Sequence, residues 1–116
     1  MSSHQLLDVA QAYFDLWNQK NIASLSSCFS ENVRLRDWEV EVSGSKNVVE
    51  ANRKIFSTLP AVEILVINML PCCEKMTVSC EIELLLNNEE STTLKVIDVI
   101  EFDRDLKITA LRAYRG

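Results

Sequence analysis

Glycine and proline are scarce in this 116-residue chain: the glycines stand at 44 and 116, and the prolines at 60 and 71. Interdomain linkers and low-complexity tracts are usually rich in such residues, and the chain contains no segment of that composition and no internal repeat. A chain of this length buries most of its apolar surface in a single core. We therefore expect one domain over residues 1–116.

The chain also lacks an excess of positive charge. It has 12 lysine and arginine residues against 17 aspartate and glutamate residues, a net charge of −5, whereas surfaces for nucleic acid or anionic membranes are basic. The longest apolar stretch, around Ile64–Leu70, is broken by Asn68 and is too short to cross a bilayer. Met1–Gln5 has no basic segment followed by an apolar run. We expect no nucleic acid, no membrane, no secretory signal and a cytoplasmic location.

Histidine is nearly absent, and the cysteine spacing does not suit a metal. His4 is the only histidine, and Cys72 and Cys73 are adjacent instead of forming a C-x-x-C pair. Cys80 falls on the apolar face of an expected strand, where a thiol behaves as a small apolar group. We therefore expect reduced thiols and no metal site.

Helical periodicity marks the first half of the chain. One apolar stripe at helical spacing contains Leu6, Leu7, Ala10, Tyr13, Phe14 and Trp17. Ser2 followed by Gln5 is typical of a capping box at the start of that helix. A short second helix is expected over Ile22–Cys28, and a third from Ser45 as N-cap to the stop at Pro60.

Period-two alternation marks most of the second half and one earlier segment. The expected strands are Val33–Asp37, Val62–Leu70, Met76–Leu86, Thr92–Phe102 and Lys107–Arg115. Asn87–Asn88 predicts a hairpin turn. Helices followed by strands joined through short turns predict an α+β fold, in which three helices pack on the concave side of a strongly curved antiparallel or mixed sheet.

Asp98 is the most informative residue of these strands, because alternation places it on an apolar face. The residues on that face are Leu94, Val96, Asp98, Ile100 and Phe102. A carboxyl group among apolar side chains is costly to ionise, so its pKa should rise and it can stay protonated and donate a hydrogen bond. Such acids gather at functional sites, but structural networks produce them too. The residues alone favour both interpretations equally.

Two more polar side chains fall on apolar faces, Tyr13 in the first helix and Asp37 in the Val33–Asp37 strand. A single tyrosine of this kind is more often a core residue with a satisfied hydroxyl than a catalytic donor, and aromatic residues at such positions mostly serve packing. If a ligand pocket lies between the helices and the sheet, its expected lining residues are Trp17, Trp38, Phe56, Val96, Ile100 and Phe102.

Four segments carry a resemblance to a known family over nearly the whole chain. They are Tyr13–Asn18, Phe29–Val33 leading into Arg36–Asp37, Val96–Phe102 and Ile108–Gly116. The chain resembles the nuclear-transport-factor-2-like (NTF2-like) superfamily, and within it the ketosteroid isomerase and SnoaL-like branch. The resemblance implies a cone-shaped curved sheet with three helices on its concave face. It is less specific for a reaction, because one fold hosts both enzymes and non-catalytic binders.

The resemblance also implies roles for three residues. By position, Asp37 matches the catalytic base of ketosteroid isomerase, and Tyr13 and Asp98 match its two oxyanion donors. In that enzyme an apolar site keeps a carboxylic acid neutral. Ionised Asp37 would move a proton between carbons near a carbonyl group of a small apolar ligand, while Tyr13 and protonated Asp98 would donate hydrogen bonds to the oxygen. This chemistry needs no cofactor.

Departures from the family pattern favour a second hypothesis, a non-catalytic ligand-binding or dimerisation module. Trp38 stands where the family usually has proline, and Asn52 stands about where the isomerases have a tyrosine that supports the first oxyanion donor. Two related mechanisms fit less well. A scytalone-dehydratase-like site needs pocket histidines, and His4 is the only histidine of the chain. A limonene-epoxide-hydrolase-like site needs an arginine near Asp98, and the one candidate is Arg112, which would have to reach Asp98 from another strand.

The other face of the Asp98 strand is apolar as well, at Ile97 and Val99. If the helices cover the opposite face, these side chains are exposed unless a second subunit covers them. We therefore expect a homodimer through the outer sheet face, as the resemblance also implies.

Overall fold

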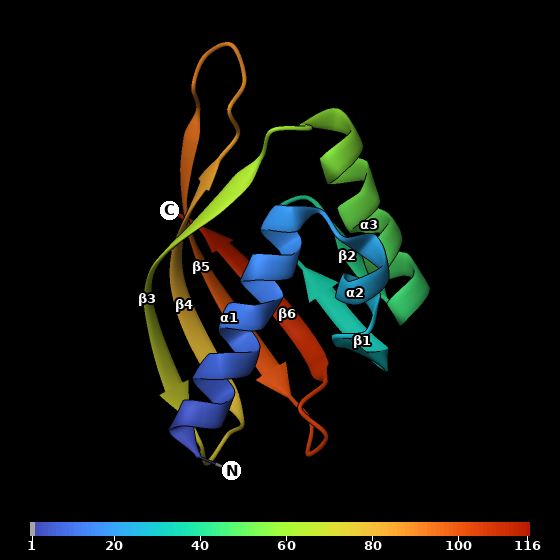
Figure 1. Cartoon of the computed structure of the whole chain (residues 1–116), viewed down its shortest axis with the longest axis vertical. Helices are drawn as coiled ribbons and strands as arrows, with labels where there is room; N and C mark the ends of the chain where they lie inside the picture. Colours follow the sequence, from blue (N-terminus) through green and yellow to red (C-terminus); the bar gives the residue numbers. More distant parts are fainter. Residues whose placement is uncertain (1) are drawn as a thin grey trace.

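The computed structural model describes residues 2–116; Met1, the first residue of the expected domain, lies outside the described residues. Figure 1 shows three helices beside one sheet. The elements in chain order are α1 (Ser3–Gln19), α2 (Ile22–Ser26), β1 (Phe29–Arg36), β2 (Glu41–Ser43), α3 (Ser45–Thr58), β3 (Glu63–Cys72), β4 (Thr77–Leu85), β5 (Thr93–Phe102) and β6 (Ile108–Arg115).

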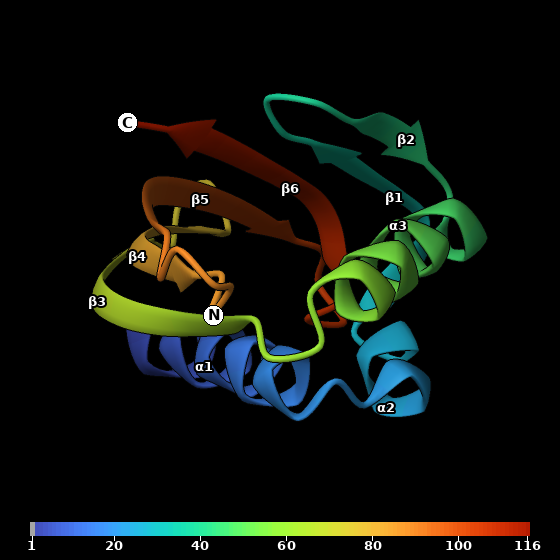
Figure 2. The same ribbon diagram turned by 90° about the horizontal axis from the view of Figure 1, so that it is seen from above.

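The strands form one mixed sheet in the order β2-β1-β6-β5-β4-β3. β1 and β6 are parallel, and the other neighbouring pairs are antiparallel. Figure 2 shows that the sheet is strongly curved without closing, and that the helices lie on its concave side. α1 packs against β3 and β4, and α3 packs against β1 and β2. The α+β fold predicted from the sequence is confirmed.

The start of α1 follows the predicted capping box. The Gln5 backbone N–H donates to Ser2 Oγ at 3.1 Å, and the Ser2 backbone N–H donates to Gln5 Oε1 at 3.1 Å. These bonds satisfy two donors that a helix N-terminus leaves free. At the other end, Lys20 closes the helix in the left-handed conformation with φ 55°.

Two helix ends differ from the prediction. α2 ends at Ser26, not Cys28, because the chain tightens there: the Cys28 N–H donates to the Leu25 carbonyl at 3.0 Å. The N-cap of α3 is Gly44 instead of Ser45. Gly44 has φ 91°, a conformation that glycine adopts without the steric cost that a side chain brings.

Several strand bounds also differ from the prediction. β1 ends at Arg36, so Asp37 lies in the turn beyond it, and the short strand β2 was not predicted. The predicted two-residue turn at Asn87–Asn88 is a longer loop from β4 to β5, because the Thr92 N–H donates to Asn88 Oδ1 at 2.9 Å and widens the connection. Pro71 lies in β3, an edge strand, where proline is tolerated.

The core lies between the concave face and the helices. The inward residues of α1 meet those of the sheet, as helical and strand periodicity predict. Its largest fully buried side chains include Leu6, Phe14, Leu25, Val48, Val62, Val78 and Ile100. This packing gives the candidate site apolar surroundings.

Candidate functional site

Asp98 lies in the middle of the concave face. β5 pairs with β4 and β6 so that Cys80, Asp98 and Ala113 form one row across three strands. Residues paired across neighbouring strands share a face of the sheet, so all three face the helices. The side chain of Ala113 is only a methyl group, so it occupies less of the volume next to Asp98 than a larger side chain would.

A second carboxyl group lies just beyond the end of β1. Arg36, the last residue of β1, pairs with Arg112 in the parallel β1–β6 ladder, and Asp37 follows it in the turn. β6 stands between β1 and β5, so the backbones of Asp37 and Asp98 are about two strand spacings apart, roughly 10 Å. The negative charge of Asp37 acts on Asp98, so the two carboxyl groups are neighbours in the fold.

The surroundings of Asp98 raise its pKa from the usual 3.8 to about 7. The larger cause is burial, which disfavours the charged carboxylate, and the smaller is the negative charge of Asp37. Its neighbours Val96 and Ile100 on the same face are buried, with 4% and 0% of their surface exposed. Near neutral pH a large share of Asp98 is therefore protonated and able to donate a hydrogen bond.

Tyr13 points from α1 towards the same place. It is 5% exposed and packs edge-to-face on Phe29, with ring centroids 6.1 Å apart. Burial raises the pKa of its hydroxyl well above 10, and the negative charges of Asp98, Cys28 and Cys80 raise it further. Tyr13 and Asp98 are thus close in space, although they lie far apart in the sequence. A neutral phenol beside a protonated carboxyl group provides two hydrogen-bond donors.

Asp37 has a structural task that the sequence did not reveal. Its Oδ1 accepts hydrogen bonds from the backbone N–H groups of Glu39 and Val40, both at 2.7 Å. Its own N–H donates to the Val40 carbonyl at 2.9 Å. This is an aspartate turn that connects β1 to β2. The available signal was an aspartate directly before the turn, but the sequence analysis included Asp37 in the predicted strand Val33–Asp37.

Asn52 orients Trp17 and not Tyr13. The Trp17 Nε1–H donates to Asn52 Oδ1 at 2.9 Å, and Asn52 Nδ2 donates to the Val48 carbonyl at 3.0 Å, both in the buried interior. The indole also packs edge-to-face on Phe56, with ring centroids 4.9 Å apart. Sequence reasoning missed this contact; the available signal was an amide at position 52, one helical turn after Val48 on the inward face.

The predicted lining residues lie in different surroundings. Val96, Ile100 and Phe102 are buried on the concave face, Trp17 is 5% exposed and Phe56 is partly buried. Trp38 lies in the turn after β1 and is 39% exposed, since the aspartate turn directs it out of the core. Of the predicted set, the structure therefore gathers all but Trp38 around the interior.

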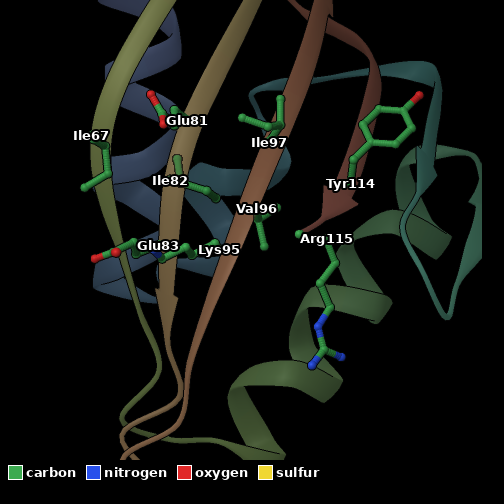
Figure 3. A pocket seen from close by; sticks show the side chains of 10 residues that line it. Ile67, Glu81, Ile82, Glu83, Lys95, Val96, Ile97, Tyr114 and Arg115 are labelled. Atoms are coloured by element: carbon green, nitrogen blue, oxygen red, sulfur yellow. The ribbon is translucent and has the colours of Figure 1, made fainter.

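Two cavities are found near other parts of the fold. One of about 460 Å³ lies on the outer face of the sheet, which is the face turned away from the helices (Figure 3). The second, of about 270 Å³, lies between α1 and the turn from β5 to β6 and includes Cys28 and Phe102. Tyr13, Asp37 and Asp98 line neither cavity.

Arg112 lies on the outer face. It pairs with Val99 across β5 and β6, and its guanidinium group donates to the Glu101 carboxylate. Asp98 is on the opposite face of the same strand pair. Arg112 therefore does not complete the aspartate–arginine–aspartate arrangement of an epoxide hydrolase. The sequence analysis ranked that mechanism lower, and the position of Arg112 on the outer face agrees with this.

The outer face carries an apolar patch. Figure 3 shows Ile67 of β3, Ile97 of β5 and Tyr114 of β6 on this side of the sheet. These side chains are 52%, 41% and 46% exposed. Charged groups such as Glu81 and Lys95 border them. A patch of this kind is typical of an interaction surface.

Three further properties concern residues 2–116. Within them, no helix combines the length and apolar character needed to cross a membrane. In the same part of the chain, no group of three histidine, cysteine, aspartate or glutamate side chains is placed to hold a metal ion. All four cysteines are free thiols, with Cys80 buried and Cys72 exposed.

The family model of the SnoaL-like domain matches residues 10–111. No curated protein matches this sequence. Three solved structures have the same fold at low identity. A SnoaL-like protein of unknown function from Burkholderia thailandensis E264 is 12% identical, with a TM-score of 0.83, covering 100% of this chain and 98% of that chain. A candidate ketosteroid isomerase from Kribbella flavida DSM 17836 is 17% identical, with a TM-score of 0.82, covering 98% and 79%.

The third structure is SalBIII, an epoxide hydrolase/cyclase-like enzyme with a role in pyran ring formation in the polyether salinomycin. It is 15% identical, with a TM-score of 0.78, covering 97% of this chain and 92% of that chain. At these identities the likeness concerns the fold. The fold neighbours thus include an enzyme, a candidate enzyme and a protein without a known activity.

Proposed function

Because this chain belongs to the SnoaL-like domain family, we propose that it is an isomerase or cyclase that removes a proton next to a carbonyl group of a small apolar compound. Asp37 is the base, and Tyr13 and protonated Asp98 are the donors to the carbonyl oxygen. The names of the neighbours from Kribbella flavida and of SalBIII support isomerase and cyclase chemistry as the class to test.

The observation that carries this proposal is the pKa of Asp98, about 7, which burial raises first and the nearby charge of Asp37 second. A base and a neutral acid must coexist if one enzyme is to abstract a proton and stabilise the resulting oxyanion. Burial of Asp98 supports its neutral form, which suits the role of a donor to the oxyanion.

The proposed step transfers one proton and one electron pair. Asp37 takes the proton from the carbon beside the carbonyl group, and the C–H electron pair moves into the enolate, whose negative charge collects on oxygen. Tyr13 and Asp98 donate hydrogen bonds to that oxygen. Asp37 then returns the proton to another carbon of the substrate. In a cyclase, the enolate carbon attacks a second carbonyl carbon of the same molecule, and the proton goes to the new alkoxide.

Proton exchange in D₂O tests the chemistry before the natural substrate is known. We expect the protein to exchange the α-protons of 3-cyclohexen-1-one and to move its double bond into conjugation, followed by ¹H NMR. Asp37→Asn should lower the rate by about 10²–10⁴-fold, the usual contribution of a general base. Tyr13→Phe should lower it by about 10²–10³-fold through loss of an oxyanion donor. Turnover that is unchanged in Asp37→Asn would reject the proposal.

A second candidate function is non-catalytic binding of the same class of ligand. It is favoured by the bonds that tie Asp37 to the turn, and by Asn52, which supports Trp17 in place of Tyr13. A binding protein of this kind would take up phenol, whose oxygen mimics an enolate oxygen, and would exchange no α-protons. Saturable phenol binding without exchange would therefore favour the binding function.

We also propose that two copies of the chain pair through the outer face. The exposed side chains Ile67, Ile97 and Tyr114 support this, since burial of such a patch is favourable. Light scattering at micromolar concentration should give the mass of a dimer. Ile97→Lys, which places a charge in the patch, should give the mass of a monomer. A monomeric unmodified protein would contradict the pairing.

A further inference from the structure

Charges of opposite sign lie on opposite sides of the outer face. In β1, Arg34 and Arg36 are both exposed, and Arg36 pairs with Arg112 of β6, which is on the outer face. Arg34 precedes Arg36 by two residues and shares its face. In β4, Glu81 and Glu83 line the outer-face cavity of about 460 Å³ (Figure 3). We call the two arginines of β1 the basic side and the two glutamates of β4 the acidic side.

The apolar patch lies between these two sides. In the sheet, β6 and β5 separate β1 from β4, and they carry Tyr114 and Ile97 of the patch. The basic and acidic sides are therefore about three strand spacings apart, roughly 14 Å. Within residues 2–116 no ion pair joins them. Contact between these opposite charges therefore needs a second molecule.

Arg36 is held next to the apolar patch. Its guanidinium group donates to the Tyr114 hydroxyl at 3.3 Å and lies over the Tyr114 ring, 5.8 Å from the centroid. Tyr114 also lines the outer-face cavity. The positive charge of the basic side is thus part of the surface that a molecule on the patch would cover.

Neighbouring strands balance part of this charge but not all of it. Each side has one member opposite a charge of the other sign; these are Arg36, opposite Glu41 of β2, and Glu83, opposite Lys95 of β5. The other members, Arg34 and Glu81, are opposite uncharged residues in both neighbouring strands. Each side therefore keeps an exposed charge for a partner.

Two-fold symmetry makes this arrangement complementary to itself. In a two-fold interface each contact occurs twice with the roles of the copies exchanged. If the basic side of one copy covers the acidic side of the other, both contacts join opposite charges. If the basic sides face each other, the acidic sides do so as well, and such contacts between like charges are unfavourable.

We propose that two copies of the chain pair with the basic side of each on the acidic side of the other, and with Ile97 near the two-fold axis. This inference rests on the pairing proposed above with the function, and it adds the orientation. A second copy is the partner that fits, because one face carries both charges on either side of the patch. The outer-face cavity next to the acidic side then receives the arginines of the other copy.

Reversing one side at a time tests the orientation. Arg34→Glu/Arg36→Glu leaves two acidic sides on the face, and Glu81→Lys/Glu83→Lys leaves two basic sides. Each variant should raise the dissociation constant of the dimer at least about tenfold, measured by sedimentation equilibrium. Circular dichroism checks that each variant is folded.

Matched controls reverse two exposed charges of the same sign away from the outer face. They are Arg53→Glu/Lys54→Glu in α3 and Glu89→Lys/Glu90→Lys in the loop from β4 to β5 (Figure 1). These controls change the net charge by the same amount as the test variants, and they should leave the dissociation constant unchanged.

Combining all four outer-face substitutions in one chain exchanges the two sides. Each copy then again places a basic side on an acidic side of the other. The dissociation constant should return to within about threefold of that of the unmodified protein, because the substitutions couple across the interface. This recovery separates lost charge complementarity from a general disturbance of the surface.

Each result supports or overturns the orientation. A dimer that neither variant weakens beyond its control overturns it, and so does weakening without recovery when the four substitutions are combined. A mixture of unmodified protein and ¹⁵N-labelled Arg34→Glu/Arg36→Glu that prefers the heterodimer to both homodimers, by native mass spectrometry, also overturns it, because like sides would then face each other. A monomeric unmodified protein overturns both orientation and pairing, whereas α-proton exchange tests the catalytic function separately.

Discussion

Asp98 lies in a strand and Asp37 in a turn at the end of another strand, and their surroundings differ in the way that matters for a carboxyl group. Asp98 is in the middle of β5 among buried aliphatic side chains, and its pKa is raised to about 7. Asp37 is in the turn beyond β1, where two backbone N–H groups donate to its Oδ1.

The proposed function gives these two aspartates different roles, and their surroundings differ accordingly. A carboxyl group surrounded by apolar groups keeps its proton, because the charged form loses its hydration. Asp37 instead accepts two backbone hydrogen bonds in the turn. The contacts of each aspartate thus depend on its position relative to the end of its strand.

The largest effect should appear in the pH dependence of stability. An unfolded chain loses the Asp98 proton near pH 4, whereas the folded chain keeps it to about pH 7. Between these values the folded state holds more protons, so the free energy of unfolding should fall as the pH rises, by about 1.4 kcal/mol per pH unit at most. The Asp98→Asn variant has no carboxyl proton at this position, so its unfolding free energy should lack this contribution.

Urea unfolding of both proteins from pH 4 to pH 8 measures this contribution. The difference in unfolding free energy, unmodified protein minus Asp98→Asn, should decline through the window and level off above pH 7. A difference that is flat or that rises with pH would contradict the burial of a neutral acid.

The second effect concerns the turn. Asp37→Ala removes the acceptor of two backbone hydrogen bonds and should lower the unfolding free energy by about 1–2 kcal/mol. Asp37→Asn keeps an oxygen at the same place and should cost less than about 0.5 kcal/mol. Urea unfolding at pH 7 compares the two. Equal losses in both variants would mean that the charge of Asp37, and not its oxygen, holds the turn.

The smallest effect connects the two aspartates. Because the charge of Asp37 is the lesser cause of the raised pKa of Asp98, Asp37→Asn should lower that pKa, by about one unit or less for charges about 10 Å apart. The midpoint should stay well above 4, since burial remains. NMR titration of the Asp98 carboxyl carbon in the variant measures the change. An unchanged midpoint would mean that the two groups do not interact.

Periodicity predicted most of the helices and strands. The alternation around Asp98 predicted both its strand and its inward direction, and the helical stripe predicted that Tyr13 is buried; the family resemblance indicated the curved sheet and the concave helices. The bounds were less accurate where local hydrogen bonds overrode the pattern. Asp37 fits strand alternation, yet its carboxylate accepts a hydrogen bond that closes a turn. Hydrophobic periodicity carries no information about such a side-chain hydrogen bond.

Contacts between distant segments could not be read from the sequence. Asn52 and Trp17 are brought together by the packing of α3 on α1, and the hydrogen bond between them depends on rotamers. The exposure of Trp38 follows from the geometry of the turn, which the strand prediction did not contain. The row of Cys80, Asp98 and Ala113 depends on strand register, which is a property of three strands together.

The most direct measurement is the titration of the Asp98 carboxyl carbon in the unmodified protein, followed by ¹³C NMR and assigned by its loss in Asp98→Asn. The structure predicts a midpoint near pH 7. A midpoint near pH 4 would contradict the assignment of Asp98 as the neutral donor of the site.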